Sequence, residues 1–204
     1  MTRLGAYDTA EVEVVVGTRR LRLLQPRSIE DLHDREAPTP PYWAQVWPSA
    51  LVLADELVHR DLAGVRAVEL GCGVGLGAIA AALAGADVIA TDVDRDAVAF
   101  ARENGRRVLG HRLPTMRADL TDLPAPLLDL APFDLVLAAD VLYTAPLAAG
   151  LVRALAALVR PGGAALIAYA WHGQADGLGA TLGWPTVHRE ERGARLVVLE
   201  RPAG

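Results

Sequence analysis

One short stretch near the middle of the chain combines acids and glycines at spacings that could bind a ligand. Glu69 precedes glycines at alternate positions, Gly71, Gly73 and Gly75, and Asp92 follows Gly71 by 21 residues. Alternating glycines let the backbone turn sharply and let a ligand lie against bare main chain. A carboxylate at the end of the next parallel strand can accept hydrogen bonds from both hydroxyls of a ribose. The spacing therefore predicts a site for a nucleoside derivative.

The charge of Glu69 narrows the choice of nucleoside. Residues 73–78 also satisfy the looser dinucleotide pattern G-x-G-x-x-G/A, which is weak evidence by itself. A carboxylate at position 69 would lie close to a pyrophosphate and repel it. The same carboxylate favours a cationic ligand, and S-adenosylmethionine carries a sulfonium and an ammonium group. The run Glu-x-Gly-x-Gly-x-Gly resembles motif I of the class I S-adenosylmethionine-dependent methyltransferases.

Further polar residues follow the later strands that the sequence predicts. Asp119, Asp140 and His172 come after the third, fourth and fifth strands, as Asp92 comes after the second. In an open α/β sheet the ligand lies outside the carboxyl ends of the strands, so we expect these residues at one edge. A single acid there is often only a helix cap, but three in consecutive units favour a site. His172 could shuttle a proton, although a wall or capping role is favoured.

The residues after the fourth strand carry the second resemblance. Asp140-Val-Leu-Tyr143 resembles the D-x-x-Y motif of the protein-lysine methyltransferases often grouped as methyltransferase family 16. The run Trp47-Pro-Ser-Ala50 resembles that group too, and residues 41–47 are similar to its bacterial electron-transfer-flavoprotein β-subunit lysine methyltransferases. The resemblance covers roughly residues 12–199. The Asn/Asp-Pro-Pro-Tyr/Phe motif does not follow this strand, which argues against amino-methylation of bases or glutamine.

This resemblance implies roles for individual residues. Asp140 and Tyr143 would face the methyl acceptor, and the Asp119-Leu120 pair would border the adenine. Several members of the group carry tryptophan where this chain has Leu120, so the adenine would pack on an aliphatic wall. The predicted cofactor-binding residues are Trp47, Glu69, Gly71, Cys72, Gly73, Asp92, Asp119, Leu120 and Ala139.

A methyl transfer from a sulfonium is an in-line displacement that needs alignment and exclusion of water, without a metal or a covalent intermediate. A lysine acceptor must first lose a proton, which costs about 4–5 kcal/mol at pH 7 for a pKa of ~10.4. Asp140 would attract and orient the ammonium, and the Tyr143 hydroxyl would align the nitrogen lone pair. We therefore predict an S-adenosylmethionine-dependent N-methyltransferase acting on a protein lysine. The alternatives are a small-molecule N-methyltransferase acting on an amine or nicotinamide-like heterocycle, and a non-catalytic nucleoside-binding protein.

Composition limits the remaining possibilities. The chain of 204 residues has 25 acidic and 20 basic residues, a net charge of −5, and all its basic residues are arginine. This balance disfavours a broad contact with a phosphate backbone, so nucleic acid is a poor candidate partner. The single cysteine, Cys72, cannot form an internal disulfide, which suits a reducing cytoplasm. We predict no signal peptide at residues 1–8 and no membrane span.

The elements that would position these residues alternate along the chain. The expected strands are residues 65–70, a second strand that ends at Asp92, and residues 113–118, 133–139 and 164–170, followed by a closing hairpin around Gly193. The expected helices cover residues 49–59, 94–108 and 148–159, the last ended by Pro161-Gly-Gly163, with one short helix after Ser28. Residues 11–16 and 20–24 would form a hairpin before the core.

We therefore predict an α/β fold with a Rossmann-like sheet of seven strands, mostly parallel with an antiparallel last strand, and helices on both faces. The length and the 52% hydrophobic content suit one core. A single domain over residues 1–204 would comprise an N-terminal hairpin and linker, residues 1–45, and the Rossmann-like core, residues 46–204.

Overall fold

The computed structural model describes residues 3–32, 40–170, 175 and 177–204. Its main sheet has seven strands in the order β5-β4-β3-β6-β7-β9-β8. β9 runs antiparallel to both of its neighbours, whereas β5, β4, β3, β6 and β7 are parallel. The predicted mostly parallel sheet with an antiparallel last strand is therefore confirmed. The strands are β3 (Arg66–Leu70), β4 (Asp87–Asp92), β5 (Thr115–Arg117), β6 (Phe133–Ala139), β7 (Val159–Tyr169), β8 (Thr186–Glu191) and β9 (Ala194–Glu200).

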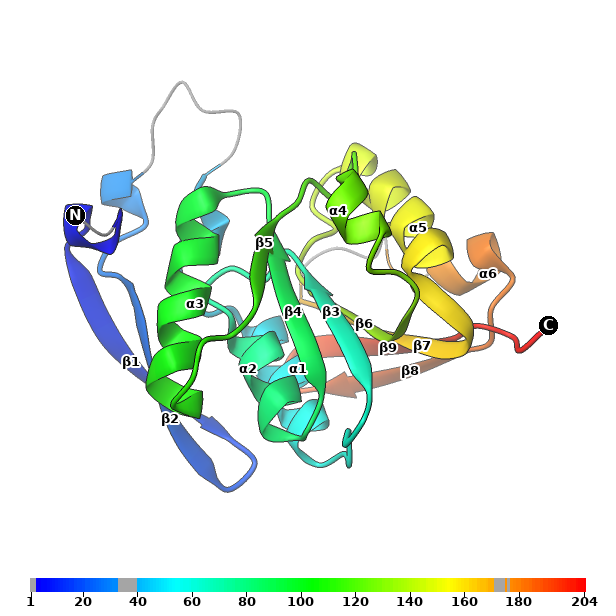
Figure 1. Ribbon diagram of the computed structural model, residues 1–204, viewed down its shortest axis with the longest axis horizontal. Helices are drawn as coiled ribbons and strands as arrows, with labels where there is room; N and C mark the ends of the chain where they lie inside the picture. Colours follow the sequence, from blue (N-terminus) through cyan, green and yellow to red (C-terminus); the bar gives the residue numbers. More distant parts are fainter. Residues whose placement is uncertain (1–2, 33–39, 171–174, 176) are drawn as a thin grey trace.

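Helices cover both faces of this sheet (Figure 1). On β6, Leu135 and Leu137 pack with helices of one face, while Val136 and Ala138 pack with helices of the other. This alternation follows from the period of two residues in a strand, which buries both sides of a parallel sheet. One face holds α1 (Pro48–Val58), α2 (Leu76–Leu83) and α3 (Arg95–Leu109), and the other holds α4 (Ala125–Leu128), α5 (Ala145–Leu158) and α6 (Leu178–Leu182).

The N-terminal hairpin, β1 (Thr9–Val16) and β2 (Arg19–Pro26), lies beside α3 (Figure 1). Its inward side chains share a core with α1 and α2. Asn104 of α3 is fully buried, and its amide exchanges hydrogen bonds with the backbone of Leu24 at 2.7 and 2.9 Å. The same amide donates to the carbonyl of Val74 at 2.9 Å, so the hairpin, α3 and the glycine loop are joined. The boundary at residue 45, between the N-terminal hairpin with its linker and the Rossmann-like core, stays a prediction.

Several boundaries differ from those predicted. Pro161-Gly-Gly163 lies inside β7, because that strand already begins at Val159. The pairing of β7 with β6 shifts register between Phe133 and Leu135 of β6. Gly163 is needed there for packing, since a Cβ would lie 2.9 Å from the carbonyl oxygen of Asp134. α5 begins earlier than predicted, at Ala145, and β5 is only Thr115–Arg117.

Short elements account for the other differences. The helix expected after Ser28 is described as a short 3-10 helix, η2 (Glu30–Leu32), and α4 and α6 were not predicted. Two more 3-10 helices are η1 (Arg3–Ala6) and η3 (Tyr42–Ala44). Among the described residues, none of the helices has the length and apolar character needed to cross a membrane.

Candidate active site

The glycine loop connects β3 to α2 and has the tight geometry that its sequence predicts. Gly71 and Gly75 adopt positive φ angles of +69° and +94°, which favour glycine. A Cβ at Gly71 would lie 2.6 Å from Cγ1 of Val141, and one at Gly75 would lie 2.9 Å from Cα of Ala101. The loop therefore needs glycine for contact with neighbouring protein segments, in addition to any space that a ligand occupies.

Glu69 lies at the carboxyl end of β3 and is only 2% exposed. Its Oε2 accepts a hydrogen bond of 2.7 Å from the backbone N–H of Ala78 in α2, and a side chain at Gly77 would collide with Oε1. Burial raises the pKa of Glu69 to about 8, and the negative charge of Asp92 adds to this rise. At pH 7 the ligand-free protein therefore holds Glu69 mostly protonated, whereas the sequence suggested a charged group.

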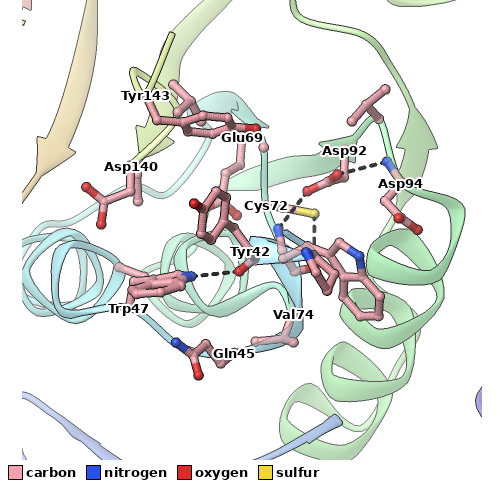
Figure 2. Close-up of a pocket in the computed structure, with 18 of the residues that line it drawn as sticks. Tyr42, Gln45, Trp47, Glu69, Cys72, Val74, Asp92, Asp94, Asp140 and Tyr143 are labelled. Carbon is pink, nitrogen blue, oxygen red and sulfur yellow. Dashed lines mark hydrogen bonds between the residues drawn. The ribbon is translucent and has the colours of Figure 1, made fainter. Parts of the chain in front are cut away.

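Asp92 ends β4 with its carboxylate held by two backbone N–H groups (Figure 2). Oδ2 accepts from Gly73 and Oδ1 accepts from Asp94, both at 2.9 Å. Burial raises the pKa of Asp92 to about 6, while these two N–H groups act in the opposite direction. The carboxylate is therefore ionised at pH 7, and each oxygen keeps a lone pair for a further donor.

A cavity of about 730 Å³ opens at the carboxyl ends of the central strands. This volume lies within the usual range for sites that bind small molecules and cofactors. Every predicted site residue lines this cavity, although its role there stays a prediction; the residues are Trp47, Glu69, Gly71, Cys72, Gly73, Asp92, Asp119, Leu120, Ala139, Asp140 and Tyr143. Trp171 and His172 lie outside the described residues.

The titratable side chains of the cavity wall are mainly acidic. Within the described part of the chain, the lining includes five carboxylic acids and no arginine or histidine; the acids are Glu69, Asp92, Asp94, Asp119 and Asp140. The described residues contain no cluster of three His, Cys, Asp or Glu that could hold a metal ion. An acidic wall of this kind attracts a cationic ligand and repels phosphate.

Asp140 is held in place by three hydrogen bonds. Its φ angle is +50°, a left-handed conformation that is uncommon for a residue other than glycine. Its N–H donates to the carbonyl of Ala168, and its Oδ1 accepts from the N–H of Ala170, both at 2.9 Å. Its Oδ2 accepts from the hydroxyl of Ser49, which is completely buried at the start of α1. Ser49 was not among the predicted site residues, and its place in the Trp47-Pro-Ser-Ala50 run was the available signal.

Comparison with known proteins identifies the central part of the chain. Residues 68–167 match the family model described as a methyltransferase domain. This chain has a methyltransferase domain. The matched residues include the glycine loop, Asp92 and the Asp140–Tyr143 motif, so they contain most of the cavity wall on the side of the sheet.

Individual relatives and structures agree with this result. The chain is 39% identical over 110 residues to histone-arginine methyltransferase METTL23 of Xenopus laevis, covering 50% of this chain and 45% of that protein. It is 35% identical over 114 residues to the electron transfer flavoprotein beta subunit lysine methyltransferase of Danio rerio, covering 54% and 42%. The matches thus span less than half of these relatives. The resemblance to class I methyltransferases, including protein-lysine methyltransferases, is confirmed.

A solved structure shows the same fold. The 16S rRNA methyltransferase RsmC of T. thermophilus, in complex with AdoMet and guanosine, superimposes with a TM-score of 0.72 at 17% sequence identity. The superposition covers 95% of this chain and 50% of the RsmC chain. At this identity the likeness concerns the Rossmann-like fold of the methyltransferase domain alone.

The glycine loop of the methyltransferase domain provides the first testable prediction. Gly75→Ala is expected to lower the free energy of unfolding by about 3 kcal/mol, since it adds a steric overlap with Ala101 to the cost of its positive φ. Gly64→Ala is the matched control, because Gly64 has a φ of +78° and open space around its Cβ. It is expected to cost only about 1 kcal/mol. Urea unfolding curves measure both, and equal losses would contradict the steric explanation.

Ser49 provides the second prediction. Ser49→Ala removes the hydroxyl that donates to Oδ2 of Asp140 and should leave that carboxylate oxygen without this partner. If Asp140 orients the acceptor as predicted, we expect about a tenfold fall in kcat with KM for S-adenosylmethionine unchanged, because misplacement of such a group affects mainly turnover. Thr181→Ala removes a hydroxyl on α6 that bonds Gly177, and it should leave kcat unchanged. A rise in KM for the cofactor with normal kcat would contradict this role.

Two tryptophans of the segment before α1 have different surroundings. Trp43 packs against Phe100 of α3, with ring centroids 5.5 Å apart, and thereby anchors the segment to the methyltransferase domain. Trp47 instead donates from Nε1 to the carbonyl of Tyr42 at 2.6 Å, and the ring of Tyr42 also contacts Tyr143. Both tryptophans line the cavity. Trp43 therefore anchors the segment, whereas the contact of Trp47 with the cofactor stays a prediction.

Other predicted residues of the cavity wall have different surroundings. Asp119 accepts hydrogen bonds from the backbone N–H and the hydroxyl of Thr121, at 2.8 and 2.7 Å, and these bonds lower the pKa of Asp119. Leu120 is half-buried beside it. Cys72 is buried, and burial raises the pKa of its thiol well above the ordinary value. Cys72 therefore serves as a compact wall residue and is a poor nucleophile.

Proposed function

We propose that this protein transfers a methyl group from S-adenosylmethionine to the side-chain nitrogen of a lysine in another protein. S-adenosylmethionine is the cofactor of its methyltransferase domain. One observation carries the proposal: a single acid-lined cavity joins the glycine loop and Asp92 to Asp140 and Tyr143. Such a cavity suits a cationic donor and an acceptor that arrives as a cation. A cytoplasmic location stays a prediction.

The residues present fit this cofactor. Asp92 would accept hydrogen bonds from the ribose hydroxyls, and Asp119 with Leu120 would border the adenine. The ionised acids around Glu69 would favour the positive charges of the ligand, and Glu69 would add to this attraction if it loses its proton when the ligand binds. When bound, S-adenosylmethionine supplies an electrophilic methyl group on its sulfonium. The acids that line the cavity make it a poor site for a dinucleotide, because a pyrophosphate would be repelled.

The acceptor side of the cavity is assigned to Asp140 and Tyr143. Asp140 is fixed by Ser49 and Ala170, so its charge can attract and orient an ammonium group without a change of its own position. The Tyr143 hydroxyl would align the nitrogen lone pair once the proton has gone to water. Burial raises the pKa of Tyr143, so the phenol stays neutral and can act as a hydrogen-bond partner.

A second candidate is methylation of a small amine or a nicotinamide-like heterocycle. The rings of Tyr42, Trp47 and Tyr143 favour this alternative, because a planar heterocycle could pack against them. A nucleic acid acceptor is not proposed, since the described cavity lining has no basic residue to bind phosphate. The relatives described above are an arginine methyltransferase and a lysine methyltransferase, so the test must separate these two acceptors.

The test is to incubate the protein with methyl-labelled S-adenosylmethionine and a soluble lysate of its source. A discrete labelled protein band that yields methyllysine on hydrolysis is the expected result. The chain contains no lysine, so methyllysine cannot come from the enzyme itself. Methylarginine in the band would show that the acceptor is an arginine and not a lysine. Label confined to small molecules would favour the second candidate, and no label in any fraction would overturn both.

A further inference from the structure

Tyr7 lies outside the matched residues 68–167 but contacts two segments that border the cavity. It follows η1, which lies beside α3 (Figure 1). Its hydroxyl donates to Oδ2 of Asp96 at 2.5 Å, and its ring packs edge-on against that of Trp43, with centroids 6.0 Å apart. We propose that Tyr7 is a positioning residue that holds the carboxylate of Asp92 in the orientation that binds the ribose hydroxyls of S-adenosylmethionine. This role rests on the proposed contact of Asp92 with the ribose and does not depend on the identity of the acceptor.

A chain of hydrogen bonds connects the Tyr7 hydroxyl to one oxygen of Asp92. The backbone N–H of Asp96 donates to Oδ1 of Asp94 at 2.7 Å. The backbone N–H of Asp94 in turn donates to Oδ1 of Asp92 at 2.9 Å (Figure 2). Asp94 is the N-cap of α3 and Asp96 lies in its first turn, so this side chain fixes the start of the helix. Tyr7 therefore holds the turn that supplies an N–H group to Asp92.

The ring of Tyr7 supports the donor of the other Asp92 oxygen. The N–H of Gly73 donates to Oδ2 of Asp92 at 2.9 Å. A Cβ at Gly73 would lie 3.1 Å from the carbonyl oxygen of Trp43, so the backbone of Trp43 packs directly on the glycine loop. The rings of Tyr7, Trp43 and Phe100 all contact one another, with centroids 5.5 to 6.0 Å apart. Tyr7 thus helps to press Trp43 against the loop that supplies the second N–H group.

These two connections matter because the backbone donors set the direction of the Asp92 carboxylate. Each oxygen accepts one backbone N–H, and the lone pair that remains must point at a ribose hydroxyl. A small displacement of either donor would turn the carboxylate away from the ligand and weaken both contacts. The described residues that line the cavity include Trp43 and Asp92 but not Tyr7. Tyr7 therefore acts through its neighbours and not by touching the cofactor.

A pair of ligands that differ only in the ribose hydroxyls tests this role. S-adenosylhomocysteine and its 2′,3′-dideoxyadenosyl analogue are titrated into the protein by calorimetry. Wild type should bind S-adenosylhomocysteine at least about tenfold more tightly, because the analogue leaves the Asp92 carboxylate without partners. Tyr7→Phe keeps the ring and removes the hydroxyl, so it should weaken S-adenosylhomocysteine by about fivefold and leave the analogue unchanged. Tyr7→Leu also removes the ring contacts with Trp43 and should weaken both ligands.

Substitutions of Asp96 provide matched controls for the hydrogen bond. Asp96→Ala removes the acceptor of the Tyr7 hydroxyl and should reproduce the effect of Tyr7→Phe. Asp96→Asn still offers a side-chain oxygen to that hydroxyl and should keep the wild-type preference for the ribose. The double variant Tyr7→Phe/Asp96→Ala should be no worse than either single variant, because both remove the same bond. Thr181→Ala removes a hydroxyl on α6 and should leave the affinities for both ligands unchanged.

The comparison of the two ligands separates positioning from general destabilisation. If Tyr7→Phe weakened both ligands equally, or weakened neither, the positioning role would be overturned. Equal affinity of the wild-type protein for the two ligands would overturn the ribose contact of Asp92 and the role of Tyr7 with it. Both titrations are made without an acceptor, so a failure of the proposed transfer to lysine would leave these affinities unchanged. The two failures are therefore distinguishable.

Discussion

Asp140→Asn is expected to lower turnover about 100-fold, because it removes the negative charge that would attract and orient the acceptor ammonium. Asparagine has nearly the same shape, and its amide can still bond Ser49 and Ala170, so the loop should keep its conformation. Affinity for S-adenosylmethionine should stay within about threefold of wild type, because the lost charge would act on the acceptor and not on the binding of the cofactor. Initial rates of label transfer and calorimetric titration with the cofactor measure these two effects.

Asp134→Asn is the matched control for that substitution. Asp134 lies on the same strand, β6, near its opposite end, where its carboxylate bonds Arg160 and the backbone of Arg66. Loss of this charge should leave kcat unchanged.

Tyr143→Phe should also lower turnover, because it removes the hydroxyl that would align the acceptor nitrogen. Wild-type turnover in both Asp140→Asn and Tyr143→Phe would refute the assignment of the acceptor site.

Glu69→Gln is expected to stabilise the ligand-free protein at alkaline pH, by on the order of 4 kcal/mol above pH 8. The pKa of Glu69 is about 8 in the folded protein, against an ordinary value of 4.5. Between these values the folded state binds a proton that the unfolded state does not, so the contribution to stability falls as pH rises. Glutamine cannot ionise, yet it can still accept the hydrogen bond from Ala78. The two proteins should therefore be about equally stable near pH 5.

Unfolding in urea at intervals from pH 5 to 9 measures this difference, and each substitution is compared with wild type under identical conditions. Glu190→Gln, on the exposed face of β8, is the control and should give a difference that is nearly independent of pH. A second readout concerns the cofactor. If Glu69 loses its proton when a cation binds, wild-type affinity for S-adenosylmethionine should improve from pH 6.5 to 8.5, and the Glu69→Gln variant should lack this improvement. Parallel stability curves for both proteins would show that Glu69 is ionised throughout.

The strand ends and the glycine loop could be predicted from the sequence because both are local or periodic features. Asp92, Asp119 and Asp140 each follow an apolar run, and parallel strands place their carboxyl ends at one edge of a sheet. The position of these three acids in one cavity follows from this rule. The turn at Gly193 likewise forced the last two strands into a hairpin, which made β9 antiparallel.

Other features depended on contacts between distant segments. Pro161-Gly-Gly163 is typical of a turn, but pairing with β6 places it inside β7. The two tryptophans look alike in the sequence, and the contacts of Trp43 with Tyr7 and with Phe100 on α3 distinguish its anchoring role. Local patterns carry no information about such neighbours.

The sequence alone determined the order of the elements, the glycine loop and the acids at the strand ends, since these depend on local backbone preferences and hydrophobic periodicity. The tertiary structure decided the protonation and the hydrogen-bond partners of those acids. Ser49 and Asp140 are 91 residues apart, and their hydrogen bond exists only because α1 packs beside the end of β6. Glu69 is protonated because the folded core removes it from water, and burial is a property of the whole fold.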